Sequence, residues 1–310
     1  MASLTWIAWL KGFQPFPNPE KPPGPTSHEV VSWIKRILAI SRAGHSGTLD
    51  PQVTGVLPVM LGNATKIANA LLTSGKEYIC IMRLHRQEEP QKVREAATEF
   101  VGTIYQRPPV RSSVKRRVRT RHIYYLDILE IEDQNVLFRV GCQAGTYIRK
   151  LVYDLGEVLG SGAHMAELRR TRTGPFKEDN TLATLYDVKD AYQFWHEDKD
   201  DRLLRQYLQP LENGVQHLPQ IIIRDTAVDA ICHGANLAVT GVLQLHDDIE
   251  PGDYVALMTL KGELVALGIA QQKSQQILQA SSGIVADTKR VVLAAGTYPS
   301  SWRKKTKDTG

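Results

Sequence analysis

The stretch Gly44-His45-Ser46-Gly47-Thr48-Leu49-Asp50-Pro51-Gln52-Val53-Thr54-Gly55-Val56-Leu57-Pro58 combines a turn, a single carboxylate and a following apolar run. The glycines at 44 and 47 permit backbone angles that other residues resist. Pro51 fixes its own φ and disfavours the α region for Asp50. Segments of this composition are often plain turns. A carboxylate held in a specified turn can also act as a nucleophile, so the stretch alone leaves both interpretations open.

The segments around this stretch predict where the carboxylate would be held. Thr26 and Glu29 have the spacing of a capping box, and an apolar helical repeat follows them to Leu38. After the stretch, residues 76–84 have the composition of a central strand. Residues 123–131 and 136–142 predict a hairpin, and a helix with Thr146 as its cap is expected from about residue 147. Residues 163–176 predict another strand, and residues 180–205 predict helix.

The composition indicates an ordinary globular protein with a polyanionic partner. The net charge is +5, which favours RNA, DNA or an acidic membrane without choosing among them. The three cysteines are isolated from one another, so a cysteine-based zinc site is not expected. No apolar run is long enough to span a bilayer, and the apolar start lacks the basic residues of a signal peptide. We therefore expect a cytoplasmic protein, or a nucleolar one in a nucleated cell.

A basic segment and a β-rich C-terminal part suggest how an RNA could be held. Residues 106–121 contain seven Lys or Arg residues among prolines and serines. Such a run is often only a solvated face, but it can also follow a phosphate backbone. Glycines punctuate short β-rich runs over residues 219–299, which predicts a separate small barrel or sandwich. The predicted organisation is an extended lead-in (1–25), a main domain (26–210), this β domain and a basic tail (300–310).

Three side chains make one possible constellation with the Asp50 loop. Arg149 could pair with Asp50 and hold it ionised. Tyr78 could stack on a nucleobase, and Leu168 could close the other side of a pocket for a flipped base. A lone carboxylate beside a nucleotide suits chemistry at the glycosidic bond. Each side chain also has a structural interpretation: Tyr78 and Leu168 as core residues, Arg149 as a surface ion pair.

The ordered motifs resemble those of TruB-type pseudouridine synthases. They are Gly44 to Pro51, Lys76-Glu77-Tyr78, Gly145-Thr146-Tyr147-Ile148-Arg149 and Leu168-Arg169-Arg170-Thr171, preceded by Lys21-Pro22-Pro23-Gly24-Pro25-Thr26-Ser27. Residues 106–109, 115–117, 227–236 and 298–302 resemble the dyskerin-like, archaeal branch of that family. The resemblance implies an α+β fold with a mixed, mainly antiparallel central sheet, flanking helices and a C-terminal β-barrel PUA domain.

The resemblance also implies roles for individual residues. Asp50 would be the catalytic aspartate, acting either by attack on the sugar or by proton abstraction from the ribose. Tyr78 would stack on the base and assist removal of the C5 proton, and Arg149 would pair with Asp50. Tyr147 and Leu168 would line the uracil pocket. The expected RNA-binding residues are His45, Lys21, Arg111, Lys115, His233 and Gly234.

For such an enzyme the resemblance implies no cofactor and no metal. Its partners would be an H/ACA guide RNA, the substrate RNA, a small zinc-ribbon protein, a Gar-type β-barrel protein and a kink-turn-binding protein reached through the guide. The expected activity is isomerisation of uridine to pseudouridine, mainly in rRNA. Two alternatives stay open: a stand-alone tRNA pseudouridine synthase, and a non-catalytic RNA-binding scaffold built on the PUA domain.

Overall fold

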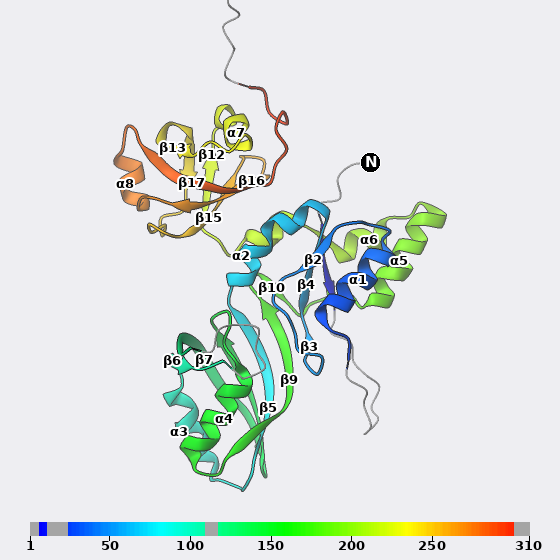
Figure 1. Cartoon of the computed structure of the whole chain (residues 1–310), viewed down its shortest axis with the longest axis vertical. Coiled ribbons are helices and arrows are strands. Elements are labelled where there is room, and N and C mark those ends of the chain that lie inside the picture. Colours follow the sequence, from blue (N-terminus) through cyan, green and yellow to red (C-terminus); the bar gives the residue numbers. More distant parts are fainter. Residues whose placement is uncertain (1–5, 11–23, 109–116, 301–310) are drawn as a thin grey trace, which may run out of the picture. The chain divides into compact units, whose positions relative to one another are not determined.

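The computed structural model describes residues 6–10, 24–108 and 117–300, and it divides the chain into two compact units (Figure 1). The first unit comprises the described residues of 8–60 and 71–208. The second comprises those of 1–7, 61–70 and 209–310. Residues 61–70 therefore belong with the C-terminal unit, which the sequence patterns did not predict.

A seven-stranded sheet forms the centre of the first unit. Its main path runs in the order β10-β9-β5-β8-β7-β6, and β3 pairs with β9 off that path. The β5–β8, β5–β9 and β7–β8 pairs are antiparallel, whereas β3 and β9 are parallel. The strands are β3 (Thr54–Gly55), β5 (Lys76–Leu84), β6 (Gly102–Gln106), β7 (Arg119–Glu132), β8 (Asn135–Cys142), β9 (Ala163–Thr173) and β10 (Phe176–Lys177).

Helices α3 (Pro90–Glu99) and α4 (Ile148–Leu159) contribute to the core of this sheet. Inward-facing residues alternate along the strands, for example Cys80, Met82 and Leu84 on β5, because successive side chains of a strand point to opposite faces. The apolar stripe of α4 meets them with Leu151 and Leu155, both almost fully buried. Helix α4 begins without a side-chain cap, so the prediction that Thr146 caps it was wrong. The Thr146 hydroxyl donates instead to the Gln143 carbonyl at 2.7 Å.

Helix α1 (Ser27–Ile37) starts with the expected capping box, in which Thr26 and Glu29 bond reciprocally. It packs beside α5 (Leu185–Asp198), which is followed by α6 (Arg202–Tyr207) (Figure 1). The helical segment expected over 180–205 is therefore two helices, separated at Lys199, whose φ is +59°. A second sheet has the order β11-β1-β4-β2, with strands β1 (Trp6–Leu10), β2 (Ala43–His45), β4 (Leu57–Leu61) and β11 (Leu208–Pro210).

The C-terminal unit has a six-stranded, barrel-like sheet in the order β13-β17-β16-β15-β12-β14. The pairing of β12 with β15 is parallel, and the other pairs are antiparallel. The strands are β12 (Gln220–Ile223), β13 (Leu237–Ala238), β14 (Val242–Leu245), β15 (Tyr254–Met258), β16 (Leu264–Ala270) and β17 (Ile284–Val291). The helical elements are η1 (Gly62–Ile67), η2 (Leu211–Val215), α7 (Asp225–Cys232), η3 (Val239–Gly241) and α8 (Ser274–Gln279). Helix α2 (Ala68–Thr73) is shared between the two units, because the division falls after residue 70. This observed architecture confirms the expected fold class.

Candidate active site

The loop that carries Asp50 lies between β2 and β3, and hydrogen bonds hold its backbone before and after Asp50. The hydroxyl of Ser27, at the start of α1, accepts from the Leu49 amide at 2.9 Å and donates to the Leu49 carbonyl at 3.3 Å. The Asp50 carbonyl accepts from the Val53 amide at 2.8 Å, which closes a turn around Pro51. The Asp50 side chain itself is 65% exposed. The backbone is therefore held while the carboxylate stays open to solvent.

The Arg170 side chain on β9 hydrogen-bonds to the backbone of this loop. It is only 1% exposed, and it donates through Nε to the Val56 carbonyl at 2.8 Å and through Nη2 to the Gly47 carbonyl at 3.0 Å. Gly47 has a φ of +77°, and a Cβ there would lie 3.2 Å from the Arg170 guanidinium. Gly55 has a φ of +105°, and its Cβ would lie 2.0 Å from the Arg170 carbonyl oxygen. Two glycines thus allow the loop to approach β9 closely.

Arg170 has a role that the sequence patterns did not assign. Leu168 lies two residues before Arg170 on the same strand and was expected to face the pocket. Residues two apart on a strand share a face. This spacing was the available signal that Arg170 also points inward. An arginine is almost never buried unless its donors are satisfied, and here two loop carbonyls accept from it.

The structure brings Arg149 to Asp50. Arg149 is the second residue of α4, and its Nη2 lies 3.6 Å from Asp50 Oδ2. Both side chains are more than half exposed. An exposed ion pair of this kind contributes at most about 1 kcal/mol to stability. Its main effect is therefore on the direction of the carboxylate rather than on folding.

Tyr78 and Leu168 lie on adjacent strands, and Tyr78 is close enough to Asp50 to be affected by its charge. In the β5–β9 register Tyr78 is opposite Arg170, and Leu168 is opposite Cys80. Both are half-buried and pack against the core of the sheet. Burial raises the pKa of the Tyr78 phenol, the Arg170 charge opposes the rise, and the Asp50 charge adds to it. Tyr78 is therefore a neutral phenol at physiological pH.

Tyr147 is held by Gln106, a residue that the sequence patterns did not single out. The Gln106 side chain accepts from the Tyr147 amide at 2.9 Å and donates to its carbonyl at 3.1 Å. Gln106 is 2% exposed at the end of β6, where it is the first residue of the basic segment. A buried glutamine in a basic run has no periodic signature, so only the tertiary structure identifies it.

His45 lies beside the loop in contact with α1. Its ring meets that of His28 edge-on, with centroids 5.0 Å apart. Burial lowers the pKa of His45, and the nearby His28 and Arg170 charges lower it further. Its Nδ1 is buried without a hydrogen-bond partner among the described residues. His45 is therefore a neutral imidazole at the edge of the site.

A basic groove of about 480 Å³ follows the end of β6 and the start of β7. Arg119 Nε and Arg121 Nε are buried and have no hydrogen-bond partner within residues 24–108 and 117–300. Arg121 also approaches Gly145, where a Cβ would lie 3.1 Å from its Nη2. The groove is lined by Tyr105, Arg117, Val118, Arg119, Thr120 and Arg121.

The other expected RNA-binding residues fall either outside the described residues or in the C-terminal unit. Lys21, Arg111 and Lys115 fall outside the described residues. His233 and Gly234 belong to the C-terminal unit, at the end of α7. The His233 side chain is 64% exposed, with Nδ1 2.8 Å from the Asp229 carbonyl, and no neighbour lies within 4 Å of a Cβ at Gly234.

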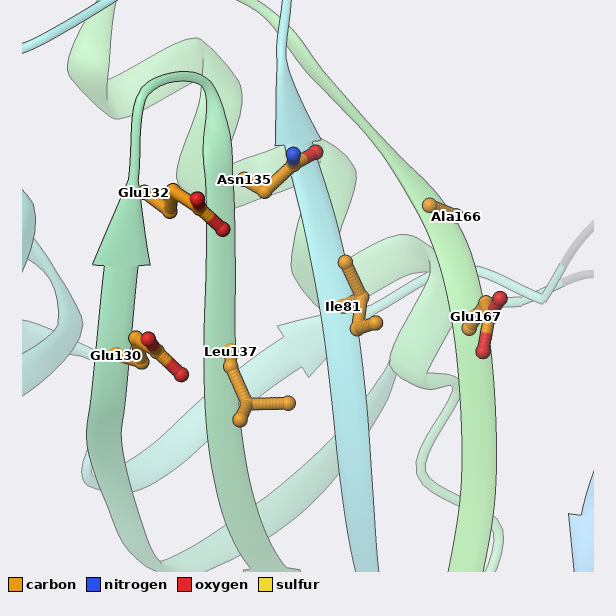
Figure 2. Close-up of a pocket in the computed structure, with 7 residues that line it drawn as sticks. All are labelled: Ile81, Glu130, Glu132, Asn135, Leu137, Ala166 and Glu167. Carbon is orange, nitrogen blue, oxygen red and sulfur yellow. The ribbon is translucent and has the colours of Figure 1, made fainter.

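The face of the large sheet away from α3 and α4 carries an acidic pocket of about 360 Å³ (Figure 2). Apolar side chains from three strands, Ile81, Leu137 and Ala166, form part of its lining. Carboxylates of Glu130, Glu132 and Glu167 and the amide of Asn135 supply its polar atoms, as Figure 2 shows.

Neither a metal cluster nor a membrane span appears in the described part of the chain. No group of three or more His, Cys, Asp or Glu residues there is arranged to hold a metal ion. No helix among those residues is long and apolar enough to cross a bilayer.

Known proteins are similar to this chain in sequence and fold over nearly its whole length. The N-terminal domain of the TruB family of pseudouridylate synthases matches residues 35–148, the C-terminal domain of tRNA pseudouridylate synthase B matches 149–216, and the PUA domain matches 219–292. A probable tRNA pseudouridine synthase B of Methanopyrus kandleri is 61% identical over 289 residues, covering 93% of this chain and 85% of that protein. The corresponding protein of Thermococcus kodakarensis is 57% identical over 288 residues, with the same coverage of 93% and 85%.

Two solved structures extend the comparison to the fold. A chain of a Cbf5-Nop10-Gar1 complex has 53% identity and a TM-score of 0.89, covering 96% of this chain and 87% of that one. A chain of an H/ACA RNP bound to a substrate RNA containing 2′-deoxyuridine has 50% identity and a TM-score of 0.87, covering 96% and 88%.

The fold and these similarities define an RNA-modifying isomerase with an appended RNA-binding module. The chain belongs to the TruB family of pseudouridine synthases and carries a C-terminal PUA domain. It is accordingly a catalytic pseudouridine synthase.

Proposed function

We propose that this enzyme converts uridines selected by an H/ACA guide RNA, mainly in rRNA, with Asp50 as its catalytic residue. The observation that carries the proposal is the Asp50–Arg149 ion pair on a loop fastened by the buried Arg170. The similarity to a chain from an H/ACA RNP bound to a substrate RNA supports the guided form of the reaction. With it we propose residues 26–210 as the catalytic domain, residues 219–299 as the PUA domain and a cytoplasmic location.

The reaction breaks the N1–C1′ bond of uridine and forms a C5–C1′ bond, after which C5 loses a proton and N1 gains one. An ionised Asp50 begins either route, by attack on the sugar or by removal of a ribose proton. Arg149 directs that carboxylate through the ion pair, in which Nη2 lies 3.6 Å from Asp50 Oδ2. Neutral Tyr78 offers a ring face for stacking and a hydroxyl near C5, while Leu168 and Tyr147 bound the uracil pocket.

The RNA backbone would follow the basic groove. Arg117, Arg119 and Arg121 are the cations lining it, and each contact with a phosphate releases counterions and makes binding salt-dependent. Lys21, Arg111 and Lys115 would extend this path, and His45 would contact the RNA beside the flipped nucleotide. His233 and Gly234 would hold the guide on the PUA domain.

Small partner proteins would complete the ribonucleoprotein particle that this chain forms with the guide RNA. The solved complexes with similar chains contain Nop10 and Gar1, so we propose a zinc-ribbon and a Gar-type partner here as well, with a kink-turn-binding protein reached through the guide. The pocket of Figure 2 suits one of these protein partners better than RNA, because its three carboxylates would repel phosphates.

A mass-spectrometric assay for pseudouridine tests the proposal. The assembled particle should convert its target uridine, and Asp50→Asn should abolish conversion while RNA binding survives. Asp127→Asn is the matched control, because Asp127 is also a partly exposed carboxylate paired with an arginine, 2.8 Å from Arg139. Conversion by Asp50→Asn would refute the assigned role.

The relatives from Methanopyrus kandleri and Thermococcus kodakarensis are named as tRNA enzymes, which favours a second candidate function. The purified chain would then modify tRNA without a guide. Incubation with tRNA alone separates the two functions, since the guided enzyme should leave tRNA unmodified unless a matching guide is added.

A further inference from the structure

The Gln106 side chain connects the edge of the large sheet to the first turn of α4. Gln106 is the last residue of β6 and is almost fully buried. Its amide oxygen accepts from the Tyr147 amide at 2.9 Å, and its amide nitrogen donates to the Tyr147 carbonyl at 3.1 Å. One side chain therefore binds both backbone polar groups of a single residue. A carboxamide can do this because it carries an acceptor and two donor hydrogens on one planar group.

These two hydrogen bonds restrain the torsion angles at which the chain turns into the helix. Tyr147 is the N-cap residue of α4, with a φ of −96° and a ψ of 102°, and the helix has no side-chain cap. The N–H and C=O groups of Tyr147 lie on either side of its Cα, so bonds to both restrain φ and ψ together. The same carbonyl accepts from the Leu151 amide at 3.0 Å, which closes the first turn. The direction in which α4 starts therefore depends on Gln106.

Gln106 is itself held in place by the sheet. The antiparallel pairing of β6 with β7 places its backbone opposite Arg119. A buried amide is retained only where its polar atoms find partners, and Tyr147 supplies a partner for each of them. The glutamine is therefore a fixed point from which the first turn of α4 is placed.

Arg149 lies in that first turn, two residues after Tyr147. Its Nη2 is 3.6 Å from Asp50 Oδ2, which exceeds the roughly 3.2 Å at which N–H···O hydrogen bonds are usually made. The ion pair is thus at the limit of direct contact. A change in the direction of the first turn would move the guanidinium relative to the carboxylate, and a displacement of about 1 Å at a catalytic group costs on the order of a hundredfold in rate.

Apolar packing keeps α4 on the sheet independently of Gln106. Ile148 and Leu151, at the start of the helix, are both buried in the core of the sheet. Loss of the Gln106 hydrogen bonds should therefore shift the first turn without unfolding the helix. The expected effect on the rate of the reaction is larger than the effect on stability.

We propose that Gln106 is a positioning residue, which aims Arg149 at Asp50 by fixing the start of α4. The inference rests on the proposed function, because it requires the Asp50–Arg149 pair to act in catalysis. Structural support alone is the competing interpretation. In that case Gln106 would only satisfy buried backbone groups, and its loss would lower stability without a specific effect on the rate.

Single-turnover conversion of a guide-bound target RNA by the assembled particle tests the assignment. Gln106→Met keeps the length of the side chain and removes both bonds to Tyr147. It should slow conversion at saturating RNA at least about tenfold, while the dissociation constant of the RNA stays within about threefold of the wild type. Val93→Ala is the control for lost stability, because Val93 is buried in the same core on α3. At a temperature where both variants are folded, Val93→Ala should convert uridine at the wild-type rate.

A double-mutant cycle with Arg149→Met separates positioning from structural support. If Gln106 acts through Arg149, adding Gln106→Met to Arg149→Met should slow the reaction by less than about twofold, measured with excess enzyme over extended incubation. Losses that multiply in the double variant would overturn the assignment, and so would a wild-type rate for Gln106→Met alone.

The single variants at the ion pair keep this inference distinct from the proposed function. Conversion at the wild-type rate by Asp50→Asn would refute the proposed function. Strongly reduced conversion by Asp50→Asn and Arg149→Met, together with a wild-type rate for Gln106→Met, would refute the role of Gln106 alone.

Discussion

Replacing Arg170 by methionine should separate the stability of the site from its chemistry. The change leaves the Gly47 and Val56 carbonyls without their donors. Each hydrogen bond from a charged donor contributes about 1.5–3 kcal/mol, and part of that loss is offset because a guanidinium no longer has to be buried. We expect a net loss of about 2–4 kcal/mol in the free energy of unfolding. The catalytic loop then loses its anchor on β9, and a displacement near 1 Å costs on the order of a hundredfold in rate.

The assay combines urea denaturation with single-turnover conversion of a guide-bound target RNA. In the Arg170→Met particle the rate of conversion should fall by about a hundredfold, while the dissociation constant of the RNA stays within about threefold of the wild type. Arg170→Lys should give a smaller loss of both quantities, because a lysine keeps the charge and one donor direction.

Arg139→Met is the matched control. Arg139 lies on β8, its side chain is 47% exposed, and its Nη2 lies 2.8 Å from Asp127 Oδ2. Its loss should cost no more than about 1 kcal/mol and leave the rate unchanged. If Arg170→Met were destabilised as expected but converted uridine at the wild-type rate, the idea that Arg170 positions the Asp50 loop would be wrong.

Three further changes test other parts of the site. Gly55→Ala should destabilise the protein by more than about 3 kcal/mol, because its Cβ would lie 2.0 Å from a backbone oxygen; Gly262→Ala, also at positive φ but in open space, should cost only about 1 kcal/mol in the same denaturation series. Burial raises the pKa of Glu77, but the hydroxyls of Thr171 and Tyr125 and the charges of Arg139 and Arg172 together lower it below its usual value. Its stabilisation is therefore present above pH 4.5 and lost as the pH falls through the lower folded-state pKa. Glu77→Gln should therefore flatten the dependence of unfolding free energy on pH in this acid range, and an unchanged slope would contradict the assignment. Ser27→Ala removes both bonds to Leu49 and should cost about 1–2 kcal/mol and slow conversion, measured by denaturation and by single turnover.

Local chemistry explains which parts of the fold could be predicted. The capping box at Thr26 and the strand over residues 76–84 depend on residues close together in the sequence. Both could therefore be predicted, and the structure confirms both. The motifs also identified the residues that meet at the site, since Asp50 and Arg149 are 99 positions apart yet their side chains lie 3.6 Å apart. Periodicity could not show that meeting; the resemblance to a known family suggested it.

The missed features depend on tertiary contacts. Gln106 looks like a member of a basic, solvent-facing run, and only its burial against backbone groups shows otherwise. For Arg170 the spacing from Leu168 indicates an inward direction, but its bonds to the loop carbonyls appear only in the tertiary structure. Thr146 has the side chain of a helix cap, but the Gln143 carbonyl takes its hydroxyl instead. Residues 61–70 join the C-terminal unit through contacts such as Lys66 Nζ to the Val292 carbonyl, at 3.0 Å, which no local pattern predicts.

The openness of the Asp50–Arg149 pair has a consequence for what the enzyme will accept. Water weakens the attraction of an exposed ion pair, whereas the same pair acts far more strongly once water is expelled. The protein supplies the ion pair and the residues around it, and the bound RNA must exclude water from the open side of the site. We therefore expect free uridine and uridine monophosphate to remain unreacted, because neither is large enough to seal the site, and selectivity for RNA then begins with the exclusion of solvent.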